Sequence, residues 1–172
     1  MEIRVERISK GIDRATFDCG EPALNEYFAK HARQNDENQI ASCFVMLNSA
    51  NKAIGYYAYS MAQIARISLP LHQAKGIPGY PLGAIRIGRL ARDNSVRGTG
   101  CGELLLKDCL KRIVGFAQKE DHPAFKFVIV DAKNDNAIQF YKKFGFTHFL
   151  DQPNSLLMAL DTIEKACKSG HL

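Results

Sequence analysis

The second half of the chain contains a strand, a glycine-rich loop, a long helix and a second strand in direct succession. Ile85–Leu90 is predicted to be a strand, and the glycine-rich segment Arg97–Gly102 follows it after a polar turn. Glu103–Gln118 repeats its apolar residues at the spacing of a helix. Phe125–Val130 is a continuous apolar, β-branched run, typical of a strand buried on both faces. Because such crossovers are almost always right-handed and parallel, these segments predict a parallel β–α–β unit.

The rest of the chain predicts a mixed sheet with helices around this unit. A length of 172 residues fits one domain, which we expect over residues 1–161, followed by a flexible tail over residues 162–172. The other predicted elements are a first strand near Val5, a helix over Glu21–Asn35, a hairpin of Ala41–Leu47 and Ala53–Ile64, a long loop over Arg66–Leu82, a helix over Asn134–Phe144, and closing strands over Gly145–Phe149 and Leu156–Leu160.

Composition excludes several classes of protein. The hydrophobic share is 46% and the charged share 24%, which is globular, and no apolar stretch approaches the roughly 20 residues of a membrane span. The charged N-terminus lacks the apolar core of a signal peptide, so we expect a cytoplasmic protein. Five cysteines without a CxxC pair favour a reducing compartment over disulfides or zinc. The net charge of +5 permits a polyanionic partner such as RNA, although scattered surface lysines give the same total.

The glycine-rich loop is suited to binding phosphate. Glycines let the backbone turn tightly and let a ligand approach without a Cβ in the way. The helix that follows presents unpaired N–H groups and a partial positive charge, and Arg97 adds a full one. The segment is not a P-loop and lacks the spacing of a dinucleotide fingerprint. The alternative is a glycine-rich turn that binds no ligand.

Two motifs resemble signatures of one enzyme family. Arg97-x-x-Gly100-x-Gly102 resembles the pyrophosphate loop, R/Q-x-x-G-x-G/A, of the GCN5-related N-acetyltransferases (GNAT family). Asn134-x-x-Ala137-x-x-Phe140-Tyr141-x-x-x-Gly145-Phe146 resembles the second signature of that family. The resemblance extends from about Asp13 to Leu160. It implies an α/β acyl-CoA N-acyltransferase fold, with a mixed, mostly antiparallel twisted sheet, a splayed central strand pair and helices on both faces. It also implies acetyl-CoA as cofactor and no metal.

Three further segments resemble one branch of that family. Phe17-Asp18-Cys19-Gly20-Glu21-Pro22-x-Leu24-Asn25-x-Tyr27, Gly55-Tyr56-Tyr57 and Gly88-Arg89-Leu90-Ala91 are similar to the GNAT toxins of bacterial toxin–antitoxin pairs. The resemblance implies acetylation of the α-amine of aminoacyl-tRNA, which blocks translation. It also implies a ribbon-helix-helix antitoxin as partner and a homodimer. The alternatives are an acetyltransferase of a small amine or a protein N-terminus, and a non-catalytic acyl-CoA- or partner-binding module.

The resemblance also assigns cofactor contacts. Backbone groups of Leu90 and Ala91, on the open edge of a splayed strand, would bind the pantetheine arm. Asn134 would bind the same arm near its thiol. The pyrophosphate would be held by the loop amides with help from the Arg97 side chain; these loop residues are Gly98, Thr99, Gly100, Cys101 and Gly102. We interpret Cys101 as a small residue tolerated in the loop, because direct transfer to an amine needs no covalent intermediate.

Tyr141 is the candidate general acid. A phenol has a pKa near 10, so it is protonated at pH 7 and can donate to a departing thiolate. Tyr141 also belongs to an apolar helical stripe with Ala137, Phe140 and Phe144, and the alternative is therefore a core aromatic. The family pattern favours the catalytic interpretation.

The predicted central strand lacks a carboxylate between Ile85 and Arg92. A lysine amine, with a pKa of about 10.4, would need a base. The pKa of an α-amine is near 7.7–8.0 and falls further when its carboxyl is esterified, so such an amine is substantially neutral and needs little. The missing carboxylate therefore fits an aminoacyl ester, with Asp93 as an alternative base.

Candidate contacts to tRNA phosphates are basic residues that would have to cluster. Arg89 is the first candidate, joined by Lys30, Arg33, Lys142 and Lys143. The alternative for each of them is a solvated surface charge. Arg92 departs from the branch, which commonly has an apolar residue there, and its role stays open.

Overall fold

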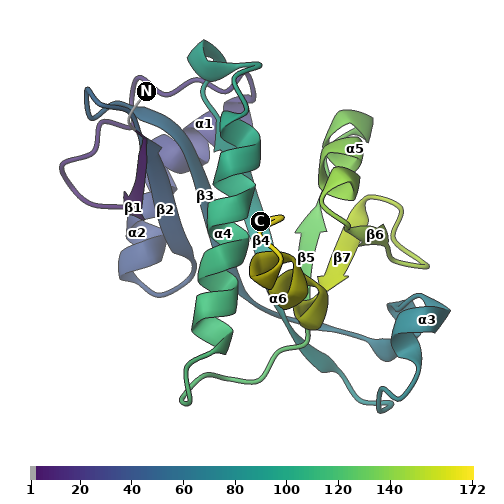
Figure 1. The fold of residues 1–172 in the computed structure, drawn as a ribbon. Helices are drawn as coiled ribbons and strands as arrows, with labels where there is room; N and C mark the ends of the chain where they lie inside the picture. The colour runs from purple at the N-terminus through teal and green to yellow at the C-terminus, as the bar shows by residue number, and fades with distance from the viewer. Residues whose placement is uncertain (1–2) are drawn as a thin grey trace. The chain divides into compact units, whose positions relative to one another are not determined.

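Seven strands and the helices between them make up the described part of the chain, residues 3–172 of the computed structural model (Figure 1). The strands are β1 (Arg4–Arg7), β2 (Ser42–Leu47), β3 (Ala53–Ile64), β4 (Leu82–Arg92), β5 (Phe127–Asp131), β6 (Thr147–His148) and β7 (Ser155–Ala159). The helices are α1 (Pro22–Glu26), the π-helix η1 (Tyr27–His31), α2 (Ala32–Glu37), the 3-10 helix η2 (Arg66–Ser68), α3 (Leu71–Ala74), the 3-10 helix η3 (Asn94–Val96), α4 (Cys101–Ala117), α5 (Asp135–Lys143) and α6 (Leu160–Lys168).

The strands are hydrogen-bonded in the order β1-β2-β3-β4-β5-β7-β6. Strand β4 pairs with β5 in parallel, whereas β1–β2, β2–β3, β5–β7 and β6–β7 are antiparallel pairs. The parallel register runs from Ala84↔Phe127 to Ile87↔Val130, while β4 itself continues to Arg92. The expected mixed, mostly antiparallel sheet and its parallel β–α–β unit are confirmed.

The chain divides into two compact units. The first comprises the residues up to Ser60 together with Gly88–Arg112, and the second comprises Met61–Ile87 together with Ile113–Leu172. Strand β4 passes from the second unit into the first between Ile87 and Gly88. The single domain expected over residues 1–161 stays a prediction.

Helices cover both faces of the strands in the first unit. Consecutive side chains of a strand point to opposite faces, and two neighbouring tyrosines on β3 use this alternation. The Tyr56 hydroxyl donates to the carbonyl of Leu24 on α1 at 2.8 Å, whereas the Tyr57 hydroxyl donates to Asp108 on α4 at 2.6 Å. Both tyrosine side chains are fully buried, so α1 and α4 pack against opposite faces, as expected.

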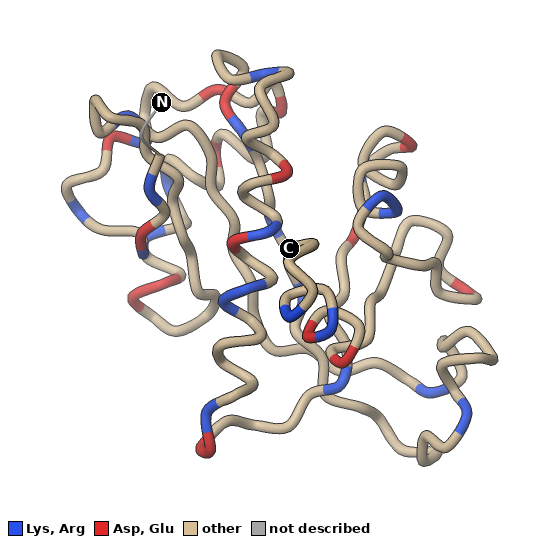
Figure 2. Tube along the Cα trace, in the orientation of Figure 1, with Lys and Arg blue, Asp and Glu red and all other residues tan. Residues whose placement is uncertain are grey.

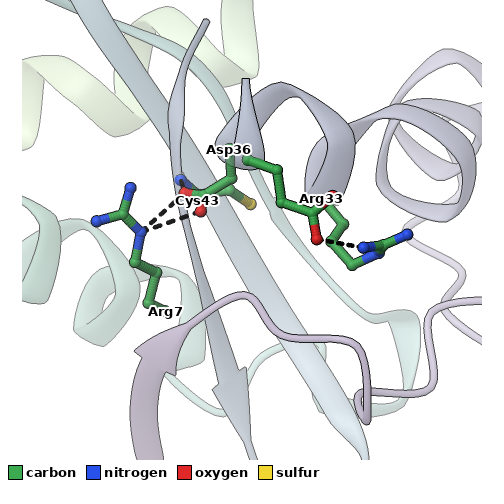
Figure 3. A network of polar contacts seen from close by, with 5 residues as sticks. Arg7, Arg33, Asp36 and Cys43 are labelled. Carbon is green, nitrogen blue, oxygen red and sulfur yellow. Dashed lines mark hydrogen bonds and ion pairs between the residues drawn. The ribbon is translucent and has the colours of Figure 1, made fainter. Parts of the chain in front are cut away.

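A buried carboxylate ties α2 to the strands of this unit (Figure 3). Asp36 is 9% exposed, and its Oδ1 accepts from the Cys43 amide on β2 at 2.8 Å. Its Oδ2 accepts from the Arg7 Nε on β1 at 3.0 Å. Hydrogen bonds to a charged carboxylate are strong, so these two contacts hold the end of α2 against β1 and β2.

The core of the second unit gathers on one face of β4, β5 and β7. Ala84, Phe127, Ile129 and Leu157 are buried there, and Leu69, from the segment between β3 and β4, is buried against them. The segment Arg66–Leu82, expected as a loop, contains η2 and α3. It is therefore a packed covering of this face.

The expectation of a flexible tail over residues 162–172 is wrong for most of that range. Residues as far as Lys168 belong to α6, and Ile163 is fully buried. Leu160, Ile163 and Cys167 share one helical face at three- and four-residue spacing, which gives the segment an apolar stripe to bury. Across residues 3–172, no helix has the length and apolar character of a membrane span.

Candidate active site

The glycine-rich loop joins β4 to α4 in the first unit and leaves open space around its glycines. Gly98 and Gly100 have φ of +77° and +82°, a left-handed conformation that favours glycine, and a Cβ built on either one meets no atom within 4 Å. Thr99 closes the turn by donating from its Oγ1 to the Val96 carbonyl at 2.7 Å. The first amides of the 17-residue helix α4 follow at Cys101. This is the open cradle at a helix N-terminus that a pyrophosphate requires.

The side chains of the loop differ in exposure. Arg97, Gly98, Thr99 and Gly100 are exposed, and Gly102 is half-buried. Cys101 is 3% exposed, and Thr99 Oγ1 lies 3.2 Å from its Sγ. A buried thiol in this place fits the interpretation of Cys101 as a small residue that fills the loop.

Asp93 lies between the end of β4 and the glycine-rich loop, and its hydrogen bonds hold this part of the chain. It is 4% exposed, its Oδ2 accepts from the Asp18 amide at 2.9 Å, and its Oδ1 accepts from the amide and hydroxyl of Ser95 at 2.9 and 2.6 Å. Burial raises the pKa of Asp93, but the hydrogen bonds from Asp18 and Ser95 outweigh it, so the pKa lies below its ordinary value of 3.8. These contacts favour a structural role for Asp93 over that of a base.

The second half of β4 carries the other candidates of the first unit. Ala91 is buried in the core, and Leu90 is half-buried. Arg89 is exposed, and its guanidinium lies over the Tyr27 ring of η1 at 4.8 Å while it donates to the Gly88 carbonyl at 2.7 Å. Desolvation raises the pKa of the half-buried Tyr27, so its phenol is neutral beneath Arg89 at physiological pH. Neither this stacking nor the π-helix that carries Tyr27 could be predicted from the sequence.

Lys30 and Arg33 are paired within their own helical segment. Lys30 Nζ lies 2.9 Å from Glu26 Oε1, and Arg33 forms an ion pair with Glu37. Arg92 is half-buried, and its guanidinium donates to the carbonyl of the neighbouring Asp93 at 3.4 Å. Arg89 is thus the best presented of the tRNA candidates in the first unit.

Helix α5 carries the candidates of the second unit. Asn134 is its N-cap, and its Oδ1 accepts from the Ala137 amide at 2.9 Å. Tyr141 is 8% exposed, with its ring 5.2 Å from Phe140 and 5.6 Å from Phe146 between centroids. Its ring is therefore packed with Phe140 of the apolar stripe that the sequence predicts, and the role of its hydroxyl as an acid stays a prediction. Lys142 and Lys143 are exposed in the last turn.

Candidate residues therefore lie in both units. Those from Arg89 to Gly102 are in the first unit with Lys30 and Arg33, and those from Asn134 to Lys143 are in the second. Among residues 3–172, no group of three or more His, Cys, Asp or Glu side chains is placed to hold a metal ion.

Sequence reasoning missed a pocket in the second unit that contains an ion pair between Arg86 and Asp131. These residues are far apart along the chain, and only the register of β4 on β5 brings them together.

Comparison with known proteins decides the family. A model of the acetyltransferase (GNAT) domain matches residues 39–148, more than half of the chain. The chain belongs to the GNAT acetyltransferase family. The expectation drawn from the two signature motifs is therefore confirmed.

Relatives within the GNAT family are similar over almost their whole length. The chain is 31% identical over 154 residues to a tRNA-acetylating toxin of Mycobacterium tuberculosis, covering 90% of each protein. It is 26% identical to AtaT complexed with acetyl-methionyl-tRNAfMet, covering 96% of this chain and 99% of that one, with a TM-score of 0.87. It is 27% identical to AtaTR bound with AcCoA, covering 96% and 98%, with a TM-score of 0.81.

Proposed function

We propose that this protein is an acetyl-CoA-dependent N-acetyltransferase that acetylates the α-amine of aminoacyl-tRNA and thereby inhibits translation. The observation that carries the proposal is the 31% identity over 90% of the chain to a tRNA-acetylating toxin. The similarity to AtaT, which has been solved with an acetylated methionyl-tRNA, supports the same substrate class. The partners that we propose are an antitoxin of the ribbon-helix-helix class and a second copy of this chain, in the cytoplasm.

The glycine-rich loop fits the cofactor. AtaTR binds AcCoA, and here Gly98 and Gly100 leave the space that a pyrophosphate needs, at the N-terminus of a long helix. In the proposal, the amides of Gly98–Gly102 hold the phosphates and Arg97 adds a positive charge. Backbone groups of Leu90 and Ala91, with Asn134, hold the pantetheine arm. When bound, acetyl-CoA supplies a thioester whose acetyl group passes to the amine while the carbon–sulfur bond breaks.

Two protons have to move during this transfer. The pKa of an α-amine, 7.7–8.0 when its carboxyl is free, falls further in the aminoacyl ester, so a substantial share of the amine is neutral. The proton that this neutral amine loses on acetylation can leave to water. In the proposal, the Tyr141 hydroxyl gives its proton to the departing sulfur and is restored from solvent. The chain then needs no buried general base, in agreement with a β4 that carries only arginines as charged residues.

The test is transfer of label from radioactive acetyl-CoA to a pool of charged tRNAs, run beside the same pool after deacylation. We expect label on the charged pool only. Tyr141→Phe should lower kcat at least tenfold, equivalent to about 1.4 kcal/mol of transition-state stabilisation. Tyr80→Phe is the matched control, because Tyr80 is 67% exposed in the same unit, and its activity should not change.

Label on no charged tRNA, from protein that binds acetyl-CoA, would overturn the proposed substrate, and small amines and peptides would be tested next. Equal rates for Tyr141→Phe and wild type would instead overturn the role of the hydroxyl and leave the substrate in place.

A further inference from the structure

The second unit contains a pocket of about 130 Å³ that none of the assigned contacts uses. Its polar lining consists of Gln63, Ser68, Arg86, Asp131, Gln152 and Ser155. Ile129 and Phe149, both buried in the core of this unit, form an apolar floor. The pocket thus combines a packed base with hydrogen-bonding walls, as small-molecule sites commonly do.

The walls of the pocket are held by hydrogen bonds. Asp131 forms an ion pair with Arg86 through one carboxylate oxygen and accepts from the Ser155 hydroxyl at 2.7 Å through the other. Ser68 is 5% exposed and donates to Asp151 at 3.1 Å, which ties the segment after β3 to the segment between β6 and β7. A site whose polar groups are already fixed loses little entropy on binding a ligand.

The pocket lies where the parallel pairing of β4 and β5 ends. The last registered pair is Ile87↔Val130, and Arg86 and Asp131 immediately flank it. Val130 and Asp131 are consecutive on β5, so their side chains point to opposite faces of the sheet. Val130 is fully buried on its face, whereas the face that carries Asp131 opens into the pocket. Asp131 precedes Asn134 by three residues, so their Cα atoms lie within about 11 Å of each other.

We propose that this pocket receives the side chain of the amino acid carried by the tRNA, and that it selects neutral, hydrogen-bonding side chains. The proposal rests on the proposed function and adds which charged tRNAs are acetylated. Asn134 is the residue of this unit to which the proposal assigns the thiol end of the cofactor. An amino acid whose α-amine reacts there has its side chain within reach of Asp131.

The lining sets the selectivity. A charged side chain would compete with Arg86 or Asp131 for its partner and leave the other charge unpaired. An apolar side chain would cover polar groups of the lining without forming hydrogen bonds to them. Sites that hydrogen-bond their substrate strongly reject analogues that cannot form the bond. A cavity of about 150 Å³ holds one benzene, so this pocket admits at most about six non-hydrogen atoms. The side chains of serine, threonine, asparagine and glutamine are uncharged, form hydrogen bonds and are small enough for the pocket.

The experiment charges one tRNA body in turn with serine, asparagine, glutamine, leucine, phenylalanine, aspartate and lysine, and measures kcat/KM for acetylation of each. Wild type should acetylate the serine, asparagine and glutamine esters at least tenfold faster than the others. Ala65→Leu adds bulk to an exposed lining residue and should slow the asparagine and glutamine esters about tenfold while sparing the serine ester. Ala124→Leu, at an exposed residue of the same unit outside the lining, should leave the ranking unchanged.

Similar kcat/KM values for all seven esters, or an unchanged ranking in Ala65→Leu, would overturn the pocket proposal while leaving tRNA acetylation intact. Acetylation of none of the esters would overturn the proposed function and, with it, the assignment of the pocket.

Discussion

The carboxylate of Asp93 connects the chemistry of one residue to the geometry of the glycine-rich loop. Its three hydrogen-bond donors, from Asp18 and Ser95, hold the chain between β4 and α4. Asp93→Asn replaces one acceptor oxygen by an NH₂ group that faces another donor. We expect it to lower the free energy of unfolding by about 1–3 kcal/mol at pH 7, because a buried donor then loses its partner. Urea unfolding measures this.

The same residue predicts a pH dependence. Because its folded pKa lies below the ordinary value of 3.8, Asp93 contributes full stability above about pH 4. That contribution is lost as the pH falls below this value and through the folded pKa. The difference in unfolding free energy between wild type and Asp93→Asn should therefore shrink between pH 5 and pH 3. Asp121→Asn, at an exposed aspartate, is the control and should show no such difference. A constant gap at both pH values would contradict the assignment.

The glycine-rich loop and helix α4 allow a paired test of conformation against binding. Gly100 has φ +82°, so Gly100→Ala strains the backbone and should cost about 1–2 kcal/mol of stability. Its Cβ also enters the space assigned to the pyrophosphate, so the Kd for acetyl-CoA should rise at least tenfold. Isothermal titration calorimetry and urea unfolding separate the two effects.

Gly115→Ala, inside helix α4, is the matched control for Gly100→Ala in the loop before it. Gly115 has a helical conformation with open space at its Cβ, so alanine there should stabilise the protein by about 0.5–1 kcal/mol. Its affinity for acetyl-CoA should not change. If Gly100→Ala binds acetyl-CoA as tightly as wild type, the loop does not hold the phosphates.

Elements with a strong local pattern were predictable from the sequence. The strand–loop–helix–strand unit from β4 to β5 and the helix after Asn134 are found as expected, because their periodicity and glycine positions are local properties. Helix α6 was missed because its apolar face is short and lies at the end of the chain. The apolar spacing of Leu160, Ile163 and Cys167 is present in the sequence, but it covers too few turns to show that tertiary contacts bury Ile163.

In the candidate site, too, some residues could be predicted from the sequence and others could not. The loop Arg97–Gly102 could be found because its residues are consecutive, and the structure gives its glycines the conformation that the motif requires. The pair of Arg86 and Asp131 could not be found, since it depends on a strand register between segments 45 residues apart. The sequence also could not distinguish a core ring from a catalytic hydroxyl at Tyr141, and the structure places the ring in the core.

Charge is spread over the chain as a whole. The net charge is +5, and Figure 2 shows basic and acidic positions interspersed along the trace. Several basic side chains are already paired with carboxylates, among them Lys30, Arg33 and Arg112. Binding of a polyanion would therefore depend on the unpaired, exposed cations, and not on the net charge.

The dependence of tRNA binding on salt tests this view. Each phosphate contact releases counterions and steepens the slope of log K against log salt by about 0.7–0.9. The double variant Lys142→Gln, Lys143→Gln on α5 should therefore reduce the slope by about 1.4–1.8 if both lysines contact phosphates.

The control variant Lys111→Gln, Lys119→Gln removes the same charge from exposed positions on or just after α4 and should leave the slope nearly unchanged. Filter binding of charged tRNA over a series of KCl concentrations gives both slopes. Equal reductions in the two variants would mean that tRNA responds to net charge alone, and Lys142 and Lys143 would then be solvated surface residues.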